Sequence, residues 1–306
     1  MATKPSEATK LPEATRAIAT KPPETAAPLT PRSPATRTSI GVILCRVNET
    51  SRRPEALLVH KRYSYAFADF VHGRYSRGRF ASNGLRSRNS RLPAGRSVAS
   101  LLADMTVQEL LDVYSLNFEQ MWYRVWVSRE RRDMFHRKSA IFQANFMRDD
   151  AGTSLQRAVR QACAGARGTL LWEVPKGRRF NARETDLACA LRELQEETGI
   201  AKSEYSIVPG VKRRSSFVSY GTRYVAVYFV AIAGPRLSAA DGQVTSAITD
   251  INQLGEVSEI GWHDIESIRY LEKTGRLETL IGPAFRLVKR HLKGGWAPRR
   301  RPPGRR

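Results

Sequence analysis

VPKGRRFNARETDLACALRELQEETGI, residues 174–200, is the most informative stretch of the sequence. After a turn-forming Pro-Lys-Gly, apolar residues recur every three to four positions, which predicts an amphipathic helix over about 185–198. Gly199 follows the last helical position and suits the left-handed turn that ends many helices. The face expected to pack on a core carries Leu187, Ala190, Leu191 and Leu194.

Three carboxylates gather on another flank of this predicted helix, because Glu193, Glu196 and Glu197 are spaced i, i+3 and i+4. Like charges at these spacings destabilise a helix by about 0.3 kcal/mol per pair, and the helix dipole disfavours negative charge near the C-terminus. A bound Mg²⁺ would compensate, because this hard cation prefers carboxylate and phosphate oxygens. The helix alone leaves a solvated acidic face as an equal alternative.

The residues that flank the helix favour the metal site. Arg192 lies beside the glutamates and can form a charge-assisted pair with Glu184, while Gly177 lets the backbone approach a ligand closely. Together, the pattern G-(x)6-E-(x)7-R-E-L-Q-E-E-T-G-I resembles the Nudix box, in which five residues separate the first Gly from the first Glu. From Glu184 to Ile200 every fixed position matches. The single departure is the sixth residue between Gly177 and Glu184.

The resemblance implies a metal-dependent hydrolase. In Nudix hydrolases the strand, loop and helix of the box bind Mg²⁺ or Mn²⁺, and the enzyme hydrolyses a nucleoside diphosphate linked to another group. The metals polarise the bridging phosphates and lower the pKa of an attacking water. By position, the resemblance implies catalytic and metal-binding roles for Glu193, Glu196 and Glu197, a metal contact from the Gly177 carbonyl, and a brace formed by Glu184 and Arg192.

A further catalytic carboxylate is expected from outside the box. In Nudix proteins that cleave RNA caps, a Glu that opens a Glu-apolar-x-x-apolar-x-Trp stretch serves as metal ligand or general base. The segment GEVSEIGWHDI at 255–265 resembles that stretch and maps the role to Glu256. An ordinary surface glutamate at the start of a strand is the alternative.

The resemblance extends over about 38–292, to Nudix proteins of the viral mRNA-decapping type from large DNA viruses. The stretches that carry it include TSIGVILCRVN, MWYRVWV, EVSEIGW and LIGPAFRLVKRHL. It implies removal of the m7G cap from mRNA, with m7GDP and 5′-monophosphate RNA as products, in the cytoplasm of an infected cell whose gene expression is shut off. Proteins of this type also hydrolyse diphosphoinositol polyphosphates.

The composition favours a polyanionic partner. The 306 residues carry a formal net charge of +22, and the 41% of hydrophobic residues suffice for a core. Most of the excess lies in three segments, 1–37, 72–100 and 293–306, whose net charges are +3, +7 and +6. Such charge binds RNA phosphates in a salt-dependent way, although a merely solvated basic surface is the alternative.

The chain is predicted to be an α/β protein with the Nudix fold, a mixed sheet between helices, interrupted by a helical basic insertion. The Pro-, Thr- and Ala-rich start cannot bury enough surface to fold, and two apolar runs after it predict a β-hairpin. The expected parts are a disordered tail at 1–37, a Nudix domain split into 38–71 and 168–292, an insertion at 72–167 with a flexible Arg-rich loop at 72–100, and a basic tail at 293–306.

Cations and aromatic residues near these motifs are candidates for RNA contact. The cations expected to bind phosphates are Lys61, Arg62, Lys176, Arg129, Arg131 and Arg132. For the first three, an ordinary surface position is an equal alternative. Trp122 and Trp126 are four residues apart, so they are expected to pack inside the helical part rather than to stack on a cap.

Cysteine usage indicates a reducing compartment, and hydropathy indicates neither a membrane span nor a secretory signal. Cys45, Cys163 and Cys189 are scattered and suit neither a disulfide framework nor a metal site. No apolar run reaches the roughly 18 residues of a membrane span, and the N-terminus lacks the apolar core of a secretory signal. A cytoplasmic rather than secreted protein is therefore expected.

Two other functions remain open at this level. A diphosphoinositol polyphosphate or nucleotide diphosphate phosphohydrolase would use the same metal site, but the long basic insertion favours RNA, because a small molecule needs no extended track. A non-catalytic RNA-binding protein on a Nudix scaffold would explain the additional loop residue. The intact Glu193, Glu196 and Glu197 argue against it.

Overall fold

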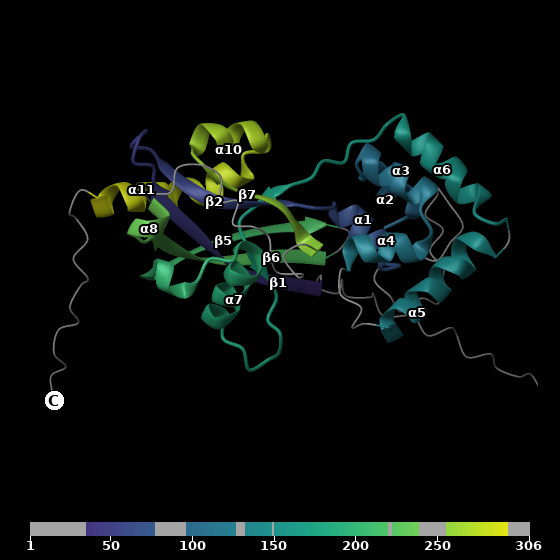
Figure 1. The fold of residues 1–306 in the computed structure, drawn as a ribbon, viewed down its shortest axis with the longest axis horizontal. Helices are drawn as coiled ribbons and strands as arrows, with labels where there is room; N and C mark the ends of the chain where they lie inside the picture. The colour runs from purple at the N-terminus through teal and green to yellow at the C-terminus, as the bar shows by residue number, and fades with distance from the viewer. Residues whose placement is uncertain are drawn as a thin grey trace, which may run out of the picture. The chain divides into compact units, whose positions relative to one another are not determined.

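The structure is a computed structural model that describes residues 35–76, 96–126, 132–148, 150–219, 222–238 and 255–292 (Figure 1). Its strands are β1 (Ala35–Val47), β2 (Pro54–Lys61), β3 (Trp172–Glu173), β4 (Lys176–Gly177), β5 (Tyr205–Ser219), β6 (Thr222–Ala233) and β7 (Val257–His263). Its α-helices are α1 (Tyr65–Val71), α2 (Val98–Ala103), α3 (Val107–Ser115), α4 (Phe118–Val125), α5 (Arg132–Phe142), α6 (Thr153–Cys163), α7 (Asp186–Thr198), α8 (Pro235–Ser238), α10 (Ile265–Leu271) and α11 (Arg276–Leu292). A π-helical turn at Gln143–Met147 and a 3-10 turn at Lys202–Glu204 accompany them.

The strands form one mixed sheet in the order β3-β2-β1-β6-β5, with β4 pairing with β1 and β7 pairing with β2. β1 runs parallel to β6, and the other pairs are antiparallel. The hairpin predicted from the two apolar runs is present as β1 and β2. The predicted α/β class and mixed sheet are therefore confirmed.

Alternation of side chains along β1 gives the sheet two separate cores. Ile40 and Leu44 point to the face that is covered by α7, where they pack with Leu194. Ile43 points to the opposite face and packs with Ile281 of α11. Figure 1 shows α7 on one side of the sheet and α10 on the other. This layering holds α7, which carries the predicted metal ligands, firmly against the sheet.

Helices α1–α6 build a third core of their own. Phe67 and Phe70 of α1 are each 1% exposed within it, so the helical part begins at α1 rather than after residue 71 as predicted, because the aromatic rings of α1 face other helices and not the sheet. Trp122 is buried in this core and Trp126 packs against it, which confirms the predicted packing role of both. The basic helical segment thus encloses a conventional apolar interior.

Two further boundaries differ from the prediction. β1 begins at Ala35, so residues 35–37 belong to the sheet rather than to the tail, because their backbone pairs with Thr222–Tyr224 of β6 and needs no apolar side chains. The Arg-rich loop is shorter than 72–100, since Tyr75 forms a bridge with Arg96 and α2 follows at once. Residues 1–34, 77–95 and 293–306 lie outside the described residues, so the predictions made for them are not tested.

Among the helices that the structure describes, none is long and apolar enough to cross a membrane. The three cysteines are free thiols, and two of them, Cys45 and Cys189, lie in the cores on opposite faces of the sheet. Burial raises the pKa of Cys45 to about 12 and that of Cys189 to about 11. Both therefore act as small apolar side chains, and the reactive thiolate is scarce at neutral pH.

Candidate active site

α7 is the helix predicted from the apolar spacing, and both of its ends are capped. The Thr185 hydroxyl accepts a hydrogen bond from the Ala188 N–H (3.2 Å), and Gly199 adopts a φ of 72° while its N–H donates to the Gln195 carbonyl (2.8 Å). Leu194 is fully buried against the sheet. This orientation presents the glutamate flank of α7 to the short strand β4.

Gly177 of β4 lies directly against the Glu193 carboxylate. A Cβ atom at this position would come within 3.0 Å of the carboxyl carbon and both oxygens of Glu193, so any larger residue would displace the Glu193 carboxylate. Burial raises the pKa of Glu193 to about 7, against the opposing charge of Arg192. A close backbone beside a perturbed carboxyl group is the environment expected of a functional site.

Arg192 ties the loop after β4 to the helix. Its Nε donates to Glu184 Oε1 (2.8 Å), and its Nη2 donates to the Arg178 carbonyl (2.9 Å). Glu184 Oε2 also accepts a bond from the Phe180 N–H (2.6 Å). The bonds from Arg192 and Phe180 lower the pKa of Glu184. The loop with one additional residue therefore still brings Glu184 onto Arg192.

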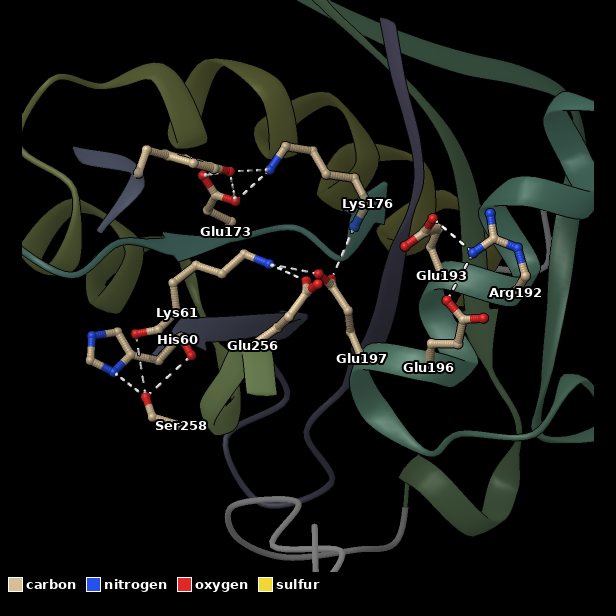
Figure 2. Close-up of polar contacts among 11 residues, drawn as sticks. His60, Lys61, Glu173, Lys176, Arg192, Glu193, Glu196, Glu197, Glu256 and Ser258 are labelled. Atoms are coloured by element: carbon tan, nitrogen blue, oxygen red, sulfur yellow. Dashed lines mark hydrogen bonds and ion pairs between the residues drawn. The ribbon is translucent and has the colours of Figure 1, made fainter. Parts of the chain in front are cut away.

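The three carboxylates predicted as metal ligands occupy two environments (Figure 2). Arg192 Nη1 donates to both Glu193 Oε1 and Glu196 Oε2, at 2.8 Å each. Glu197 is buried and faces the other way, where its Oε1 accepts from Lys61 Nζ (2.7 Å) and its Oε2 from the Lys176 N–H (3.1 Å). The negative charge on this flank of α7 is thus neutralised by two different cations, Arg192 and Lys61.

Lys61 lies between two carboxylates from distant parts of the chain. Its Nζ is 2.7 Å from Glu197 and 3.6 Å from Glu256, the residue predicted to act from outside the box. Burial lowers the pKa of Lys61, but Glu197, Glu173 and Glu256 together outweigh burial and raise it. With only 13% of its side chain exposed, Lys61 is a buried partner of carboxylates rather than an open phosphate contact.

A β-bulge between β2 and β7 aims Lys61 at this position. The register pairs His60 with Glu259 but Lys61 with Val257, which leaves Ser258 as the additional residue. The Ser258 hydroxyl lies 3.0 Å from His60 Nδ1 and 3.2 Å from the His60 carbonyl oxygen (Figure 2). These contacts fix the backbone at the end of β2, and thereby the position from which the Lys61 side chain extends.

A second series of contacts reaches Glu197 from the helical part. The Tyr65 hydroxyl of α1 lies 2.8 and 3.0 Å from the two carboxylate oxygens of Glu173. Glu173 forms an ion pair with the Lys176 ammonium group, and the Lys176 N–H bonds Glu197. Sequence reasoning missed the roles of Tyr65 and Glu173, because one lies outside the box and the other reads as an ordinary strand residue. The only local signal is the separation of three residues between Glu173 and Lys176.

The donor set suits a hard divalent cation. Glu193, Glu196 and Glu197 offer carboxylate oxygens, and Gly177 keeps the backbone free of a side chain beside them. Within the described ranges, no group of three or more His, Cys, Asp or Glu side chains is arranged as a formed metal site. Arg192 and Lys61 pair with these carboxylates instead, so a metal would compete with both.

The remaining cations predicted to bind RNA lie in different settings. Lys176 pairs with Glu173 rather than facing open solvent. Arg62 and Arg132 are exposed, the latter at the start of α5. Two others, Arg129 and Arg131, lie outside the described residues. The structure thus gathers the carboxylate residues and their two lysines at one site, and the backbone N–H of Arg62 bonds the Glu256 carbonyl beside it (2.9 Å).

Comparison with known proteins gives matches to several nucleotide and RNA hydrolases. The NUDIX domain family matches residues 144–280. The chain is 36% identical over 259 residues to the mRNA-decapping protein g5R of African swine fever virus, with 84% of this chain and 98% of that protein covered. It is 32% identical over 91 residues to the asymmetrical bis(5′-nucleosyl)-tetraphosphatase of Rattus norvegicus, covering 30% and 59% of the two chains. A crystal structure of a C. elegans Ap4A hydrolase binary complex aligns with 84% of this chain and 98% of its own, with 12% identity and a TM-score of 0.37.

Proposed function

Because the chain belongs to the Nudix hydrolase family, we propose that it is a pyrophosphohydrolase that removes the m7G cap from mRNA and releases m7GDP and 5′-monophosphate RNA. The similarity to a viral decapping protein over 84% of the chain supports this substrate. The observation that carries the proposal is the placement of Glu193, Glu196 and Glu197 along one flank of α7 beside β4, where Gly177 touches Glu193 and the Lys176 N–H bonds Glu197. In a cell, a protein with this activity would act on mRNA in the cytoplasm.

Glu193, Glu196 and Glu197 would hold Mg²⁺ or Mn²⁺, with the Gly177 carbonyl as a further oxygen donor. When bound, such ions stabilise charge on the bridging phosphates and lower the pKa of an attacking water. Arg192 and Glu184 fix the loop that follows Gly177, so the backbone is positioned before the substrate arrives.

Glu256 is the proposed general base. Its side chain is 54% exposed, so solvent water reaches it, and it shares the Lys61 ammonium with the buried Glu197. Lys61 thereby joins a base that directly precedes β7 to a metal-binding carboxylate from α7. The buried ammonium also supplies positive charge near the expected position of the phosphates.

RNA would extend from this site over basic surface. The net charge of +22 and the exposed Arg62 and Arg132 support a polyanionic track. We include the arginines at 129 and 131 in this track on the strength of the sequence alone. Raising the salt concentration should therefore weaken RNA binding before it affects hydrolysis at saturating substrate.

A second candidate is hydrolysis of dinucleoside polyphosphates, which the similarity to a bis(5′-nucleosyl)-tetraphosphatase favours. Diphosphoinositol polyphosphates are a further small substrate for the same carboxylates. Side-by-side rates on capped RNA, free cap analogue, dinucleoside tetraphosphate and diphosphoinositol polyphosphate would rank these substrates. A long RNA should be preferred if the basic track contributes to binding.

The decisive experiment follows release of labelled m7GDP from cap-labelled RNA with Mg²⁺ or Mn²⁺. The double substitution Glu196→Gln and Glu197→Gln is expected to abolish release and leave RNA binding intact, because it removes two anionic oxygen donors without changing shape. Glu119→Gln on the exposed surface of α4 is the matched control and should behave as the unsubstituted protein. Full activity of the double variant would contradict the proposal, and hydrolysis of any substrate would exclude a non-catalytic scaffold.

A further inference from the structure

The carboxylate site draws its residues from two strands that diverge. β1 and β2 pair with each other near their hairpin. Further along, β4 pairs with β1 through Gly177, and β3 pairs with β2 through Glu173. The segment 172–177, which holds both short strands, therefore crosses from the side of β2 to the side of β1.

Each of the two diverging strands supplies part of the site. Lys61 ends β2, and Glu256 directly precedes β7, which pairs with β2. From the side of β1, the Lys176 N–H of β4 bonds Glu197 Oε2 (3.1 Å), while the other oxygen of Glu197 accepts from Lys61 Nζ (2.7 Å). The position of the proposed base Glu256 relative to Glu197 therefore depends on how the crossing segment is held.

Backbone pairing fixes the crossing segment over a short length only. β3 and β4 contain two residues each, and Pro175 between them has no N–H to donate. A side-chain contact also spans the crossing, because the Glu173 carboxylate forms an ion pair with the Lys176 ammonium group (Figure 2). These side chains are 15% and 18% exposed, so salt screens the pair less than it screens a surface pair. We refer to Glu173 and Lys176 as the clasp.

Tyr65 of α1 contacts both members of the clasp. Its hydroxyl lies 2.8 and 3.0 Å from the two carboxylate oxygens of Glu173, and 3.5 Å from Lys176 Nζ. Tyr65 is 54% exposed and belongs to none of the three apolar cores, so the contact of its hydroxyl is its main contribution. A second donor from a different element restricts the rotation that a single ion pair leaves to a carboxylate.

The helical part fixes the start of α1, and thereby Tyr65. Ser64, the residue before Tyr65, donates its N–H to Glu109 Oε1 of α3 (2.5 Å). Glu109 is buried and also accepts from the Thr106 N–H (2.9 Å), so its carboxylate is itself held in place. Phe67, two residues after Tyr65, is buried in the helical core. The hydroxyl of Tyr65 therefore reaches the clasp from a firmly packed helix.

We propose that Tyr65 is a positioning residue for the metal site, which acts through the clasp on the Lys176 N–H and hence on Glu197. The inference rests on the proposed function, because it concerns the ion that Glu197 would hold. The helical part thereby supports the carboxylates through a continuous series of contacts from α3 to α7. Removal of a group that orients a metal ligand commonly changes metal affinity or activity about 10- to 100-fold.

The first measurement is hydrogen exchange of backbone amides by mass spectrometry, with neither metal nor RNA present. Tyr65→Phe removes the hydroxyl and keeps the ring, so the clasp loosens while the packing of α1 stays. Peptides that contain the Lys176 amide should exchange faster than in the unsubstituted protein, because the bond to Glu197 opens more often. Peptides from α11 should exchange at an unchanged rate, because this helix packs on the opposite face of the sheet from α7.

The second measurement is Mn²⁺ binding, followed by the electron paramagnetic resonance signal of free Mn²⁺. Tyr65→Phe should raise the Kd for Mn²⁺ about tenfold. In decapping at saturating Mn²⁺, kcat should fall and KM for RNA should stay unchanged, because Tyr65 positions the site and does not touch the RNA. The thermal unfolding midpoint should stay close to that of the unsubstituted protein, which separates positioning from a loss of stability.

Glu173→Gln provides a second variant, which removes the charge of the clasp and keeps its shape. It should change amide exchange and Mn²⁺ affinity in the same direction, and adding Tyr65→Phe to it should have little further effect, because both act through one contact. Tyr270→Phe is the matched control, since this tyrosine on α10 is 76% exposed. It should behave as the unsubstituted protein in every measurement.

Three results would overturn the inference. The first is unchanged amide exchange near Lys176 in Tyr65→Phe, and the second is a combined variant whose losses multiply. The third is a higher KM with unchanged kcat, which would assign Tyr65 to substrate contact. Absence of decapping in the unsubstituted protein would refute the proposed function instead, and amide exchange would still decide whether Tyr65 holds the clasp.

Discussion

Replacing Gly177 with alanine should disable the carboxylate site while leaving the fold intact. The added methyl group would lie within 3.0 Å of the carboxyl carbon and both oxygens of Glu193, a separation that real Cβ atoms do not adopt. Glu193 sits on a capped helix that packs on the sheet, so its carboxylate must retreat by about 1 Å. A misplacement of about 1 Å at a reacting group costs about 100-fold in rate, or about 2.7 kcal/mol of activation free energy.

The assay is release of m7GDP from cap-labelled RNA at saturating RNA, over a titration of Mn²⁺. We expect kcat to fall about 100-fold and the Mn²⁺ concentration for half activity to rise, with the thermal unfolding midpoint close to that of the unsubstituted protein. Gly165→Ala is the matched control, because no heavy atom lies within 4 Å of a Cβ there. If Gly177→Ala retained activity within about threefold, Glu193 would not be held where the chemistry occurs, and the reasoning would fail.

Two further predictions concern ionisation at this site. Lys61→Met should lower the unfolding free energy by about 3 kcal/mol at neutral pH, because it removes the cation that pairs with the buried Glu197 carboxylate, and the loss should shrink in acid as Glu197 takes up a proton. Denaturant titrations across pH would measure it, and a loss independent of pH would count against the pairing. Glu193 binds its proton more tightly in the native state, since its pKa is about 7 rather than 4.5, so with chelator present its contribution to the unfolding free energy should fall by about 3 kcal/mol as pH rises from about 4.5 to 7. Glu193→Gln should lack this fall, and identical pH profiles for the two proteins would refute the shifted pKa.

Local patterns in the sequence predicted much of α7 and its surroundings. The apolar spacing and the Gly199 that follows it predicted the helix and where it ends, because capping and amphipathicity act over one or two turns, and the structure adds Thr185 as the N-cap. The pairing of Arg192 with Glu184 also follows from short sequence separation. The expected mixed sheet follows from the resemblance, which covers most of the chain.

Other features depend on residues brought together from distant parts of the chain. Lys61 reads as an exposed cation at a strand end, yet the β-bulge at Ser258 aims it between Glu197 and Glu256. Tyr65 carries no local signal of a role at the site, yet it bonds Glu173 from 108 residues away. No local pattern encodes such neighbours, because a bulge or a register places them only after the strands have paired.

The sequence by itself therefore determined the carboxylate helix, its C-terminal cap, the loop brace and the basic character of the chain, because each depends on residues close together in the sequence or on composition. Tertiary structure alone decided which cation faces which carboxylate. Glu193 and Glu197 are four residues apart and look equivalent in the sequence, but one lies against Gly177 and Arg192, and the other is buried against Lys61. Their difference arises from the strands that α7 packs on, and burial then sets the ionisation of each.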